Sequence, residues 1–270
     1  MAEGITGHCP GDSGTRRSAL DCAAGKKQTC GTVASTVFLK LFSLILILPF
    51  PMNSQPKTTA LFWDNDGVLV DTEKLYFRAT RTILASIDIP LTKETYIDLL
   101  LTRGAGAFVL AEQKGFSPAQ IAAFRKQRNE LYISFLRTAS LVMDGVEEVL
   151  DRLHRHFPMA IVTSSDREHF DIIHARTNLL RYFDFWLVPG DFKNYKPDPE
   201  PYLLAVTRAD RPKDECIAIE DSPRGLASAR AAGIRCIVIP NDLTRGRDFS
   251  GAWKILTSIR ELPSVLAGKQ

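Results

Sequence analysis

The stretch Ala60-Leu61-Phe62-Trp63-Asp64-Asn65-Asp66-Gly67-Val68-Leu69-Val70-Asp71-Thr72-Glu73 decides the fold of this 270-residue chain. Its first four residues are apolar and are bounded by polar ones, which predicts a short buried strand. Side chains in an extended segment alternate between two faces, so Asp64 and Asp66 are expected on one side and Asn65 on the other. Gly67 then allows a sharp turn. Open α/β sheets bind ligands at the carboxyl ends of their strands, although alone this motif fits a polar turn equally well.

After residue 144 the sequence alternates between strand-like and helix-like segments. The expected core strands are the apolar runs 159–162, 185–188, 217–219 and 236–239. Helix starts are expected between them, at Ser165 with Glu168, at Asp198-Pro199 and at Ser222-Pro223. Asp144 with Glu147 predicts a further capped helix before the first of these strands. Such alternation predicts a parallel sheet with helices on both faces.

The segment between residues 72 and 143 breaks this alternation, because it contains no strand candidate. Asp71 is expected to cap its first helix and Thr92 a second one. Ser117-Pro118-Ala119-Gln120 is a strong start for a third. The sequence therefore predicts an α/β protein whose Rossmann-like parallel-sheet core (52–71 and 144–270) carries an inserted all-helical cap domain (72–143).

Composition is typical of a globular protein, with 45% hydrophobic and 24% charged residues. A net charge of +3 is too small to indicate nucleic acid or a membrane surface as a partner. The five cysteines show no metal-type spacing, and Cys216 and Cys236 lie in strand-like runs. We therefore expect inert thiols and a cytoplasmic location.

Residues 1–51 differ from the rest of the chain. Residues 3–35 are rich in small and polar residues without periodicity, and residues 37–50 are apolar apart from Lys40 and Ser43. We expect residues 1–51 to be disordered or not translated, with translation starting at Met52. The alternative is that residues 33–50 act as a signal that exports or anchors the protein.

Polar groups follow each expected core strand where the strands end. They are Asp64 and Asp66, Thr163 and Ser164, Lys196, and Glu220 with Asp221. Taken singly, each has an ordinary explanation as a turn, loop or helix-start residue. Because parallel strands end at one edge of a sheet, the four carboxylates are expected to converge there, where only a cation would relieve their repulsion. Oxygen ligands with spare water favour Mg²⁺.

These motifs resemble, in order and spacing, those of the haloacid dehalogenase-like hydrolase superfamily. The similar segments are residues 64–73, the strand ending in Thr163, Lys196-Pro197-Asp198-Pro199, and Glu220-Asp221-Ser222-Pro223 followed by Gly225. The resemblance covers about residues 58–268 and is closest to the branch with a helical cap, which includes phosphoglycolate phosphatase and β-phosphoglucomutase.

The resemblance implies a role for each of these residues. Asp64 would be the nucleophile that forms an aspartyl-phosphate, and Asp66 the general acid and base. Thr163, Ser164 and Lys196 would bind the phosphoryl oxygens. Mg²⁺ would be held by Asp64, the backbone carbonyl of Asp66, Asp221 and Glu220, the last as a ligand or as support for the ligands.

The implied reaction is hydrolysis of a small phosphorylated metabolite, either a sugar phosphate or phosphoglycolate. Two alternatives stay open, a β-phosphoglucomutase-type mutase and a non-catalytic binding module. The mutases carry a His ten residues after the second Asp, where this chain has Tyr76, and a cap Arg where it has Gly106-Ala107. Tyr76, Arg103 and Gly104 are the cap candidates for substrate choice. The sequence does not reveal the oligomeric state.

Overall fold

The computed structural model describes residues 58–267. Within them, six parallel strands form one sheet in the order β3-β2-β1-β4-β5-β6. The strands are β1 (Ala60–Trp63), β2 (Met159–Val162), β3 (Phe185–Leu187), β4 (Cys216–Glu220), β5 (Arg235–Val238) and β6 (Lys254–Ile255). The α/β class and the parallel Rossmann-like sheet are confirmed, with β1 between β2 and β4.

Helices cover both faces of the sheet, because successive strand residues point to opposite sides and are apolar on both. Leu61 and Trp63 belong to one buried cluster, which also contains residues of α5 (Val146–Leu153), α6 (Arg167–Thr177) and α9 (Leu262–Ala267). Ala60 and Phe62 belong to the other, with residues of α7 (Glu200–Ala209) and α8 (Pro223–Ala231).

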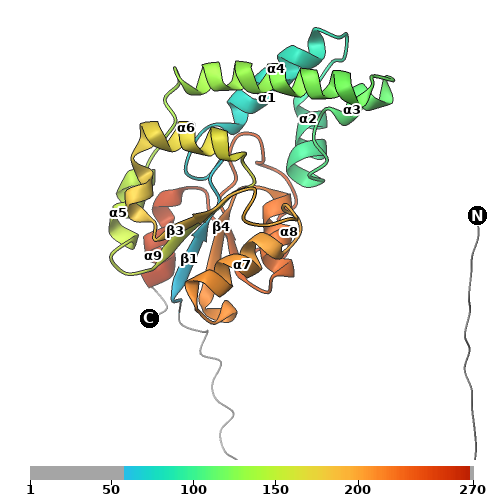
Figure 1. The fold of residues 1–270 in the computed structure, drawn as a ribbon. Coiled ribbons are helices and arrows are strands. Elements are labelled where there is room, and N and C mark those ends of the chain that lie inside the picture. The colour runs from blue at the N-terminus through green and yellow to red at the C-terminus, as the bar shows by residue number, and fades with distance from the viewer. Residues whose placement is uncertain (1–57, 268–270) are drawn as a thin grey trace, which may run out of the picture. The chain divides into compact units, whose positions relative to one another are not determined.

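The remaining helices lie between β1 and α5 in the sequence, beyond the carboxyl ends of the strands (Figure 1). They are α1 (Glu73–Ala85), α2 (Lys93–Tyr96), a π-helical turn (Ile97–Thr102), α3 (Val109–Gln113) and α4 (Pro118–Leu136). Leu84, Ile97 and Phe108 bury themselves in an apolar cluster separate from those flanking the sheet. Tyr132 and Leu136 of α4, however, belong to the cluster that contains Leu61 and Trp63, and the domain limits 52–71, 72–143 and 144–270 stay a prediction.

The N-caps of the helices agree with some of the capping predictions and differ from others. Ser117 and Gln120 form the expected capping box, and Thr92 and Ser222 cap their helices through side-chain hydrogen bonds. The prediction for Asp71 was wrong. The N-cap of α1 is Thr72, and the carboxylate of Asp71 accepts a hydrogen bond from Lys74 instead.

Two further capping predictions were wrong for a similar reason. Asp144 makes a bidentate ion pair with Arg260, and α5 starts from Gly145, whose φ is 80°. The N-cap of α6 is Asp166, while the hydroxyl of Ser165 is engaged in the candidate site described below. In each case a partner distant in sequence holds the side chain that was expected to cap a helix.

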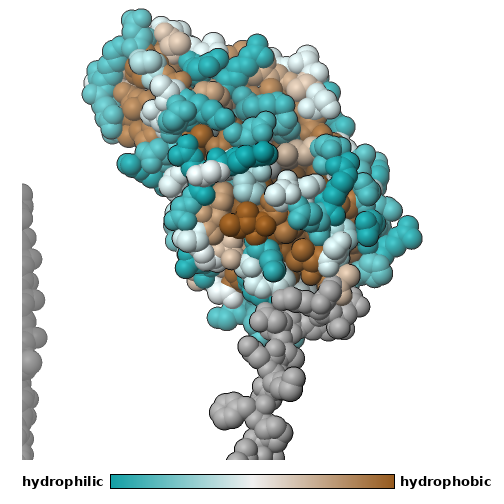
Figure 2. Space-filling view, turned by 180° about the vertical axis from the view of Figure 1, so that it is seen from behind, coloured by the Kyte–Doolittle hydropathy of each residue, from teal (hydrophilic) through white to brown (hydrophobic). Residues whose placement is uncertain are grey.

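Strand β6 was not predicted, since it has only two residues and both are exposed. No helix among residues 58–267 is long and apolar enough to cross a bilayer. The expectations for residues 1–51 lie outside the described part of the chain. Figure 2 shows small hydrophobic clusters surrounded by hydrophilic residues on the face opposite to that of Figure 1.

Candidate active site

Acidic side chains from two neighbouring strands meet at the carboxyl edge of the sheet. Asp64 follows β1, and Glu220 and Asp221 lie at the end of β4. Strand order reverses between β1 and β4, which is where open sheets of this kind bind ligands. One carboxylate oxygen from each of these three residues lies within 4.8 Å of the others. Three of the four carboxylates that the sequence predicts to converge therefore lie together, and that of Asp66 is not among them.

Lys196 connects two of these acids. Its Nζ lies 2.9 Å from Asp64 Oδ1 and 2.7 Å from Glu220 Oε1, and it also donates to the carbonyl of Val162 at 2.7 Å. Burial alone would lower the pKa of Lys196, but the carboxylates of Asp64 and Glu220 outweigh it and raise that pKa above its ordinary value. Lys196 therefore stays protonated within the cluster.

The surroundings of Asp64 and Asp221 disfavour the ionised form of both carboxyl groups. Burial raises the pKa of Asp64 to about 7, with Lys196 opposing the effect. Burial, the charge of Asp64 and that of Glu220 raise the pKa of Asp221 well above its ordinary value. A divalent cation would relieve both effects, and three carboxylates are ligands that Mg²⁺ accepts. The donor set thus fits the metal that the sequence predicts.

Glu220 is the most enclosed member of the cluster. Its Oε1 accepts hydrogen bonds from Lys196 and from the hydroxyl of Tyr202, the latter at 2.6 Å. Its Oε2 is buried with no hydrogen-bond partner among the described residues. A Cβ at Gly225 would lie 1.9 Å from that oxygen, so only glycine leaves room for it. Glu220 therefore holds Lys196 through one oxygen, while its other oxygen makes no hydrogen bond with the described residues.

Asp66 lies outside this cluster, in a cradle of neutral donors. Its Oδ2 accepts from Ser165 Oγ at 2.7 Å and from Thr163 Oγ1 at 3.4 Å, while Thr72 Oγ1 donates to its Oδ1. The amide of Asn65 donates to Oδ2 at 3.1 Å. These contacts hold the Asp66 carboxylate at the edge of the cavity, apart from the ion pairs that Lys196 makes with Asp64 and Glu220.

A cavity of about 110 Å³ opens above these residues. Asp64, Asp66, Thr163 and Ser164 line it, and Ser164 Oγ is buried without a hydrogen-bond partner among the described residues. Lys196 does not line this cavity, although it contacts Asp64 from behind. The cavity therefore brings Asp64 and Asp66 together with the hydroxyl groups of Thr163 and Ser164, as expected for a phosphoryl site.

A second cavity of about 410 Å³ adjoins the first and is formed largely by the cap. Tyr76, Leu100 and Asp166 line both cavities. Gly104 lines the second, and a Cβ on it would lie 3.2 Å from the carbonyl oxygen of Lys196. Arg103 lines neither and forms an exposed ion pair with Asp98 at 2.9 Å.

Sequence reasoning missed several side chains that line the smaller cavity: Glu73, Ser165, His169 and Arg224. Arg224 follows the Glu220-Asp221 motif closely and begins α8, a signal that could have been used. Burial raises the pKa of the Glu73 carboxyl group overall, and of the charged groups around Glu73, Arg224 lowers that pKa most. His169 is buried, and burial lowers its pKa, so the ring is neutral near pH 7. No sequence pattern distinguished it from a core residue.

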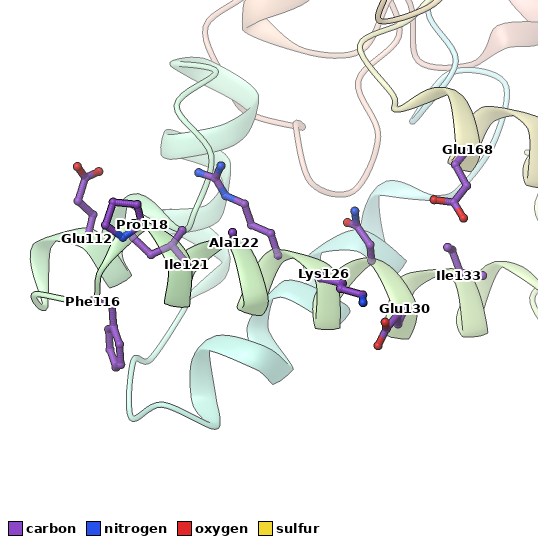
Figure 3. Close-up of a pocket in the computed structure, with 11 residues that line it drawn as sticks. Glu112, Phe116, Pro118, Ile121, Ala122, Lys126, Glu130, Ile133 and Glu168 are labelled. Carbon is purple, nitrogen blue, oxygen red and sulfur yellow. The ribbon is translucent and has the colours of Figure 1, made fainter.

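Another cavity, of about 850 Å³, shares no lining residue with the cavity that Asp64 and Asp66 line. It runs along successive turns of α4, with Glu168 of α6 at its far end (Figure 3). Its lining alternates apolar side chains such as Ile121 and Ile133 with charged ones such as Lys126 and Glu130. We assign the chemistry to the smaller cavity, because Asp64, Asp66 and several hydroxyl groups line it and Lys196 contacts Asp64 directly behind it.

A parallel sheet with paired acids at its switch point and a helical insert defines a class of hydrolytic α/β enzymes. The model of one family, described as haloacid dehalogenase-like hydrolase, matches residues 61–239. The chain belongs to this family, as the sequence motifs predicted.

Relatives narrow the position within the family. Protein CbbY of Rhodobacter capsulatus is 35% identical over 73% of this chain and 92% of its own length. A phosphorylated carbohydrates phosphatase of Thermotoga maritima is 32% identical over 77% of this chain and 97% of its own. The crystal structure of a CbbY variant from Rhodobacter sphaeroides bound to xylulose-1,5-bisphosphate has a TM-score of 0.66 and 26% identity, and covers 76% of this chain and 96% of that one. The expected enzyme class, a haloacid dehalogenase-like phosphatase, is confirmed.

Proposed function

We propose that this protein is a Mg²⁺-dependent phosphatase that hydrolyses a small sugar phosphate through an aspartyl-phosphate. The observation that carries this proposal is the convergence of Asp64, Glu220 and Asp221, with the ammonium of Lys196 paired to the first two. The relatives named for phosphorylated carbohydrates and the xylulose-1,5-bisphosphate complex support the substrate class.

In the proposed reaction, a carboxylate oxygen of Asp64 attacks phosphorus in line and the bond to the leaving oxygen breaks. Asp66 gives that oxygen a proton, then takes one from the water that hydrolyses the aspartyl-phosphate. Thr163, Ser164 and Lys196 would bind phosphoryl oxygens and offset their charge. Asp64, Asp221, the carbonyl of Asp66 and the free oxygen of Glu220 would hold Mg²⁺. When bound, the ion supplies positive charge that lets an anionic nucleophile approach an anionic phosphate.

The phosphatase is favoured over the mutase by what occupies the cap. Tyr76, at the position of the mutases' His, packs its ring edge against Tyr132 with centroids 5.1 Å apart. The guanidinium of Arg128 lies 4.2 Å from the Tyr76 ring centroid. Tyr76 lines both cavities, but its ring packs against these two side chains and burial raises the pKa of its hydroxyl, so it stays protonated near pH 7. Tyr76 therefore does not replace an imidazole in proton transfer.

Arg128 offers a contact for the rest of the substrate. It is only 8% exposed, yet its one hydrogen bond in the described structure joins Nε to the Asn129 side chain at 2.7 Å. No carboxylate of the described residues lies within ion-pair distance of it. It lines the larger of the two adjoining cavities. A buried guanidinium without an anionic partner is well suited to a polar or anionic group of the substrate.

Replacing Arg128 by Met should therefore weaken substrate binding and leave the chemical step unchanged. A Met side chain keeps apolar contact with the Tyr76 ring but removes the positive charge. We expect KM for a sugar bisphosphate such as xylulose 1,5-bisphosphate to rise about tenfold, the worth of one charge-assisted hydrogen bond. KM for p-nitrophenyl phosphate should stay within about twofold, since that substrate carries no second anion. Lys126→Met, an exposed change on the same helix outside this cavity, is the control.

The proposed function predicts phosphate release that depends on the metal. Wild-type protein should hydrolyse p-nitrophenyl phosphate with Mg²⁺ and lose that activity in EDTA. Independently of turnover, Mg²⁺ at about one hundred times its Kd should stabilise the fold by about 2.7 kcal/mol, measurable as a rise in Tm. Asp221→Asn should abolish the rise.

A panel of sugar phosphates, phosphoglycolate and nucleotides would then identify the substrate. A folded sample that binds Mg²⁺ but releases phosphate from none of them would contradict the phosphatase and favour a binding module. Formation of glucose 6-phosphate from β-glucose 1-phosphate, without free phosphate, would favour the mutase.

A further inference from the structure

A buried chain of hydrogen bonds runs from α6 to Asp66 on the side away from the cavity. The Asn65 side chain, fully buried, donates through Nδ2 to Asp66 Oδ2 at 3.1 Å. Its Oδ1 lies 2.9 Å from Nε2 of His174. Nδ1 of His174 lies 3.2 Å from the hydroxyl of Thr177. Neither Asn65 nor His174 lines the cavity, and neither has a place in the reaction described above.

The direction of each bond follows from the chemistry of the groups. An ionised carboxylate can only accept, and a protonated one still accepts through its other oxygen, so Asn65 turns its NH₂ group toward Asp66 Oδ2 and its carbonyl oxygen toward His174. That oxygen also only accepts, so Nε2 of His174 must carry the ring proton. Burial lowers the pKa of His174 to about 4, so the imidazole is neutral at pH 7 and Nδ1 is free to accept from Thr177.

His174 supplies the side-chain hydrogen bond to the carbonyl oxygen of Asn65 among the described residues, and without it only the contact with Asp66 would orient the amide. Turned over, the amide would place its oxygen against the carboxylate of Asp66 and remove one of the donors that hold Asp66. The hydroxyls of Ser165 and Thr163 contact the same Oδ2 from the cavity side. Of the three described donors to this oxygen, the amide of Asn65 is the one that does not line the cavity.

We propose that Asn65 and His174 are positioning residues, which hold the carboxylate of Asp66 in the orientation needed to protonate the leaving oxygen. The inference rests on the proposed phosphatase reaction. Its atoms balance as in that reaction: Asp66 loses a proton as the bond between phosphorus and the leaving oxygen breaks. Asn65 and His174 exchange no proton with substrate, and their hydrogen bonds stay in place throughout.

The test compares two substrates of similar shape that differ in their need for a proton. The phenoxide released from phenyl phosphate is about as basic as a tyrosine side chain, with a pKa of about 10, whereas p-nitrophenolate is stable without a proton. The constant kcat/KM reports the steps up to departure of this group and so isolates the acid role of Asp66.

His174→Phe and Asn65→Leu should lower kcat/KM for phenyl phosphate by about tenfold or more, and for p-nitrophenyl phosphate by less than about threefold. Phe170→Leu, which removes the ring packed 4.3 Å from that of His174 but none of these hydrogen bonds, should lower both constants equally. His174→Gln keeps an N–H donor in a milder change, and should give a smaller difference between substrates than His174→Phe.

Equal losses on both substrates in His174→Phe and His174→Gln would mean that these residues only support the fold, and would overturn the proposal. Unchanged constants would overturn it as well. Failure of the proposed function looks different, because the wild-type protein would then release no phosphate from either substrate in Mg²⁺.

Discussion

Asp64→Asn should eliminate phosphate release while leaving a folded protein. Asn has nearly the same shape as Asp, but its amide cannot attack phosphorus, and removal of a nucleophile typically costs on the order of 10⁴-fold or more in kcat. The fold should tolerate the change, because the buried acid cluster loses one of its negative charges and Lys196 keeps Glu220 as a partner. Circular dichroism, thermal melting and phosphate release on one preparation would measure both effects.

The matched control is Asp71→Asn, seven residues along the same stretch. Asp71 contacts Lys74 at the surface and does not line the smaller cavity. Its replacement should leave kcat within about twofold, since exposed ion pairs contribute little. Retained activity in Asp64→Asn would contradict the aspartyl-phosphate route. Incubation of wild type with a slow substrate should also yield an acid-stable, hydroxylamine-sensitive phosphoprotein that Asp64→Asn does not form.

Lys196→Met should damage both the fold and the chemistry. Lys196 is 3% exposed and is the only ammonium within ion-pair distance of Asp64 and Glu220 among the described residues. Removing one partner of a buried ion pair typically costs about 3–5 kcal/mol, because the remaining charges lose their compensation. For a protein of this size, a loss of that order corresponds to a Tm lower by about 10 °C.

Lys193→Met tests whether the effect belongs to the buried cluster. Lys193 lies in the same loop but is exposed, so the Tm of the Lys193→Met protein should differ from that of wild type by less than about 2 °C. Melting in EDTA and in Mg²⁺ adds a second comparison, because a cation among the acids should restore part of the stability lost in Lys196→Met. A Lys196→Met protein as stable as wild type in EDTA would show that the acids are protonated rather than paired.

Core strands were predictable because their residues are apolar on both faces, as parallel strands buried between helices must be. Helix caps were predicted less well. Ser117 and Ser222 act locally, so their sequence context was sufficient. Asp144 and Ser165 have equally good local patterns, but Arg260 and Asp66 engage them across the fold. A local pattern cannot reveal which of two partners a side chain takes.

Candidate site residues could be predicted where they lie at the end of an expected strand, as Asp64, Thr163 and Glu220 do. His169 and His174 were not, since both lie inside a helix whose pattern is that of an ordinary buried face. Asn65 was expected to point away from the site and was given no role, but its amide contacts Asp66. Roles that depend on packing between distant elements need coordinates.

The cap buries Leu84, Ile97 and Phe108 in a cluster that contains no strand residue. Substitutions that are far apart and share no neighbours usually add independently in free energy. Changes at Leu84, Ile97 or Phe108 should therefore disturb the sheet that carries Asp64 less than changes at Leu75 or Tyr132, which belong to the same cluster as Leu61 and Trp63. One catalytic edge can in this way serve many metabolites, as new cap surfaces arise by gradual divergence while the reaction centre is inherited intact.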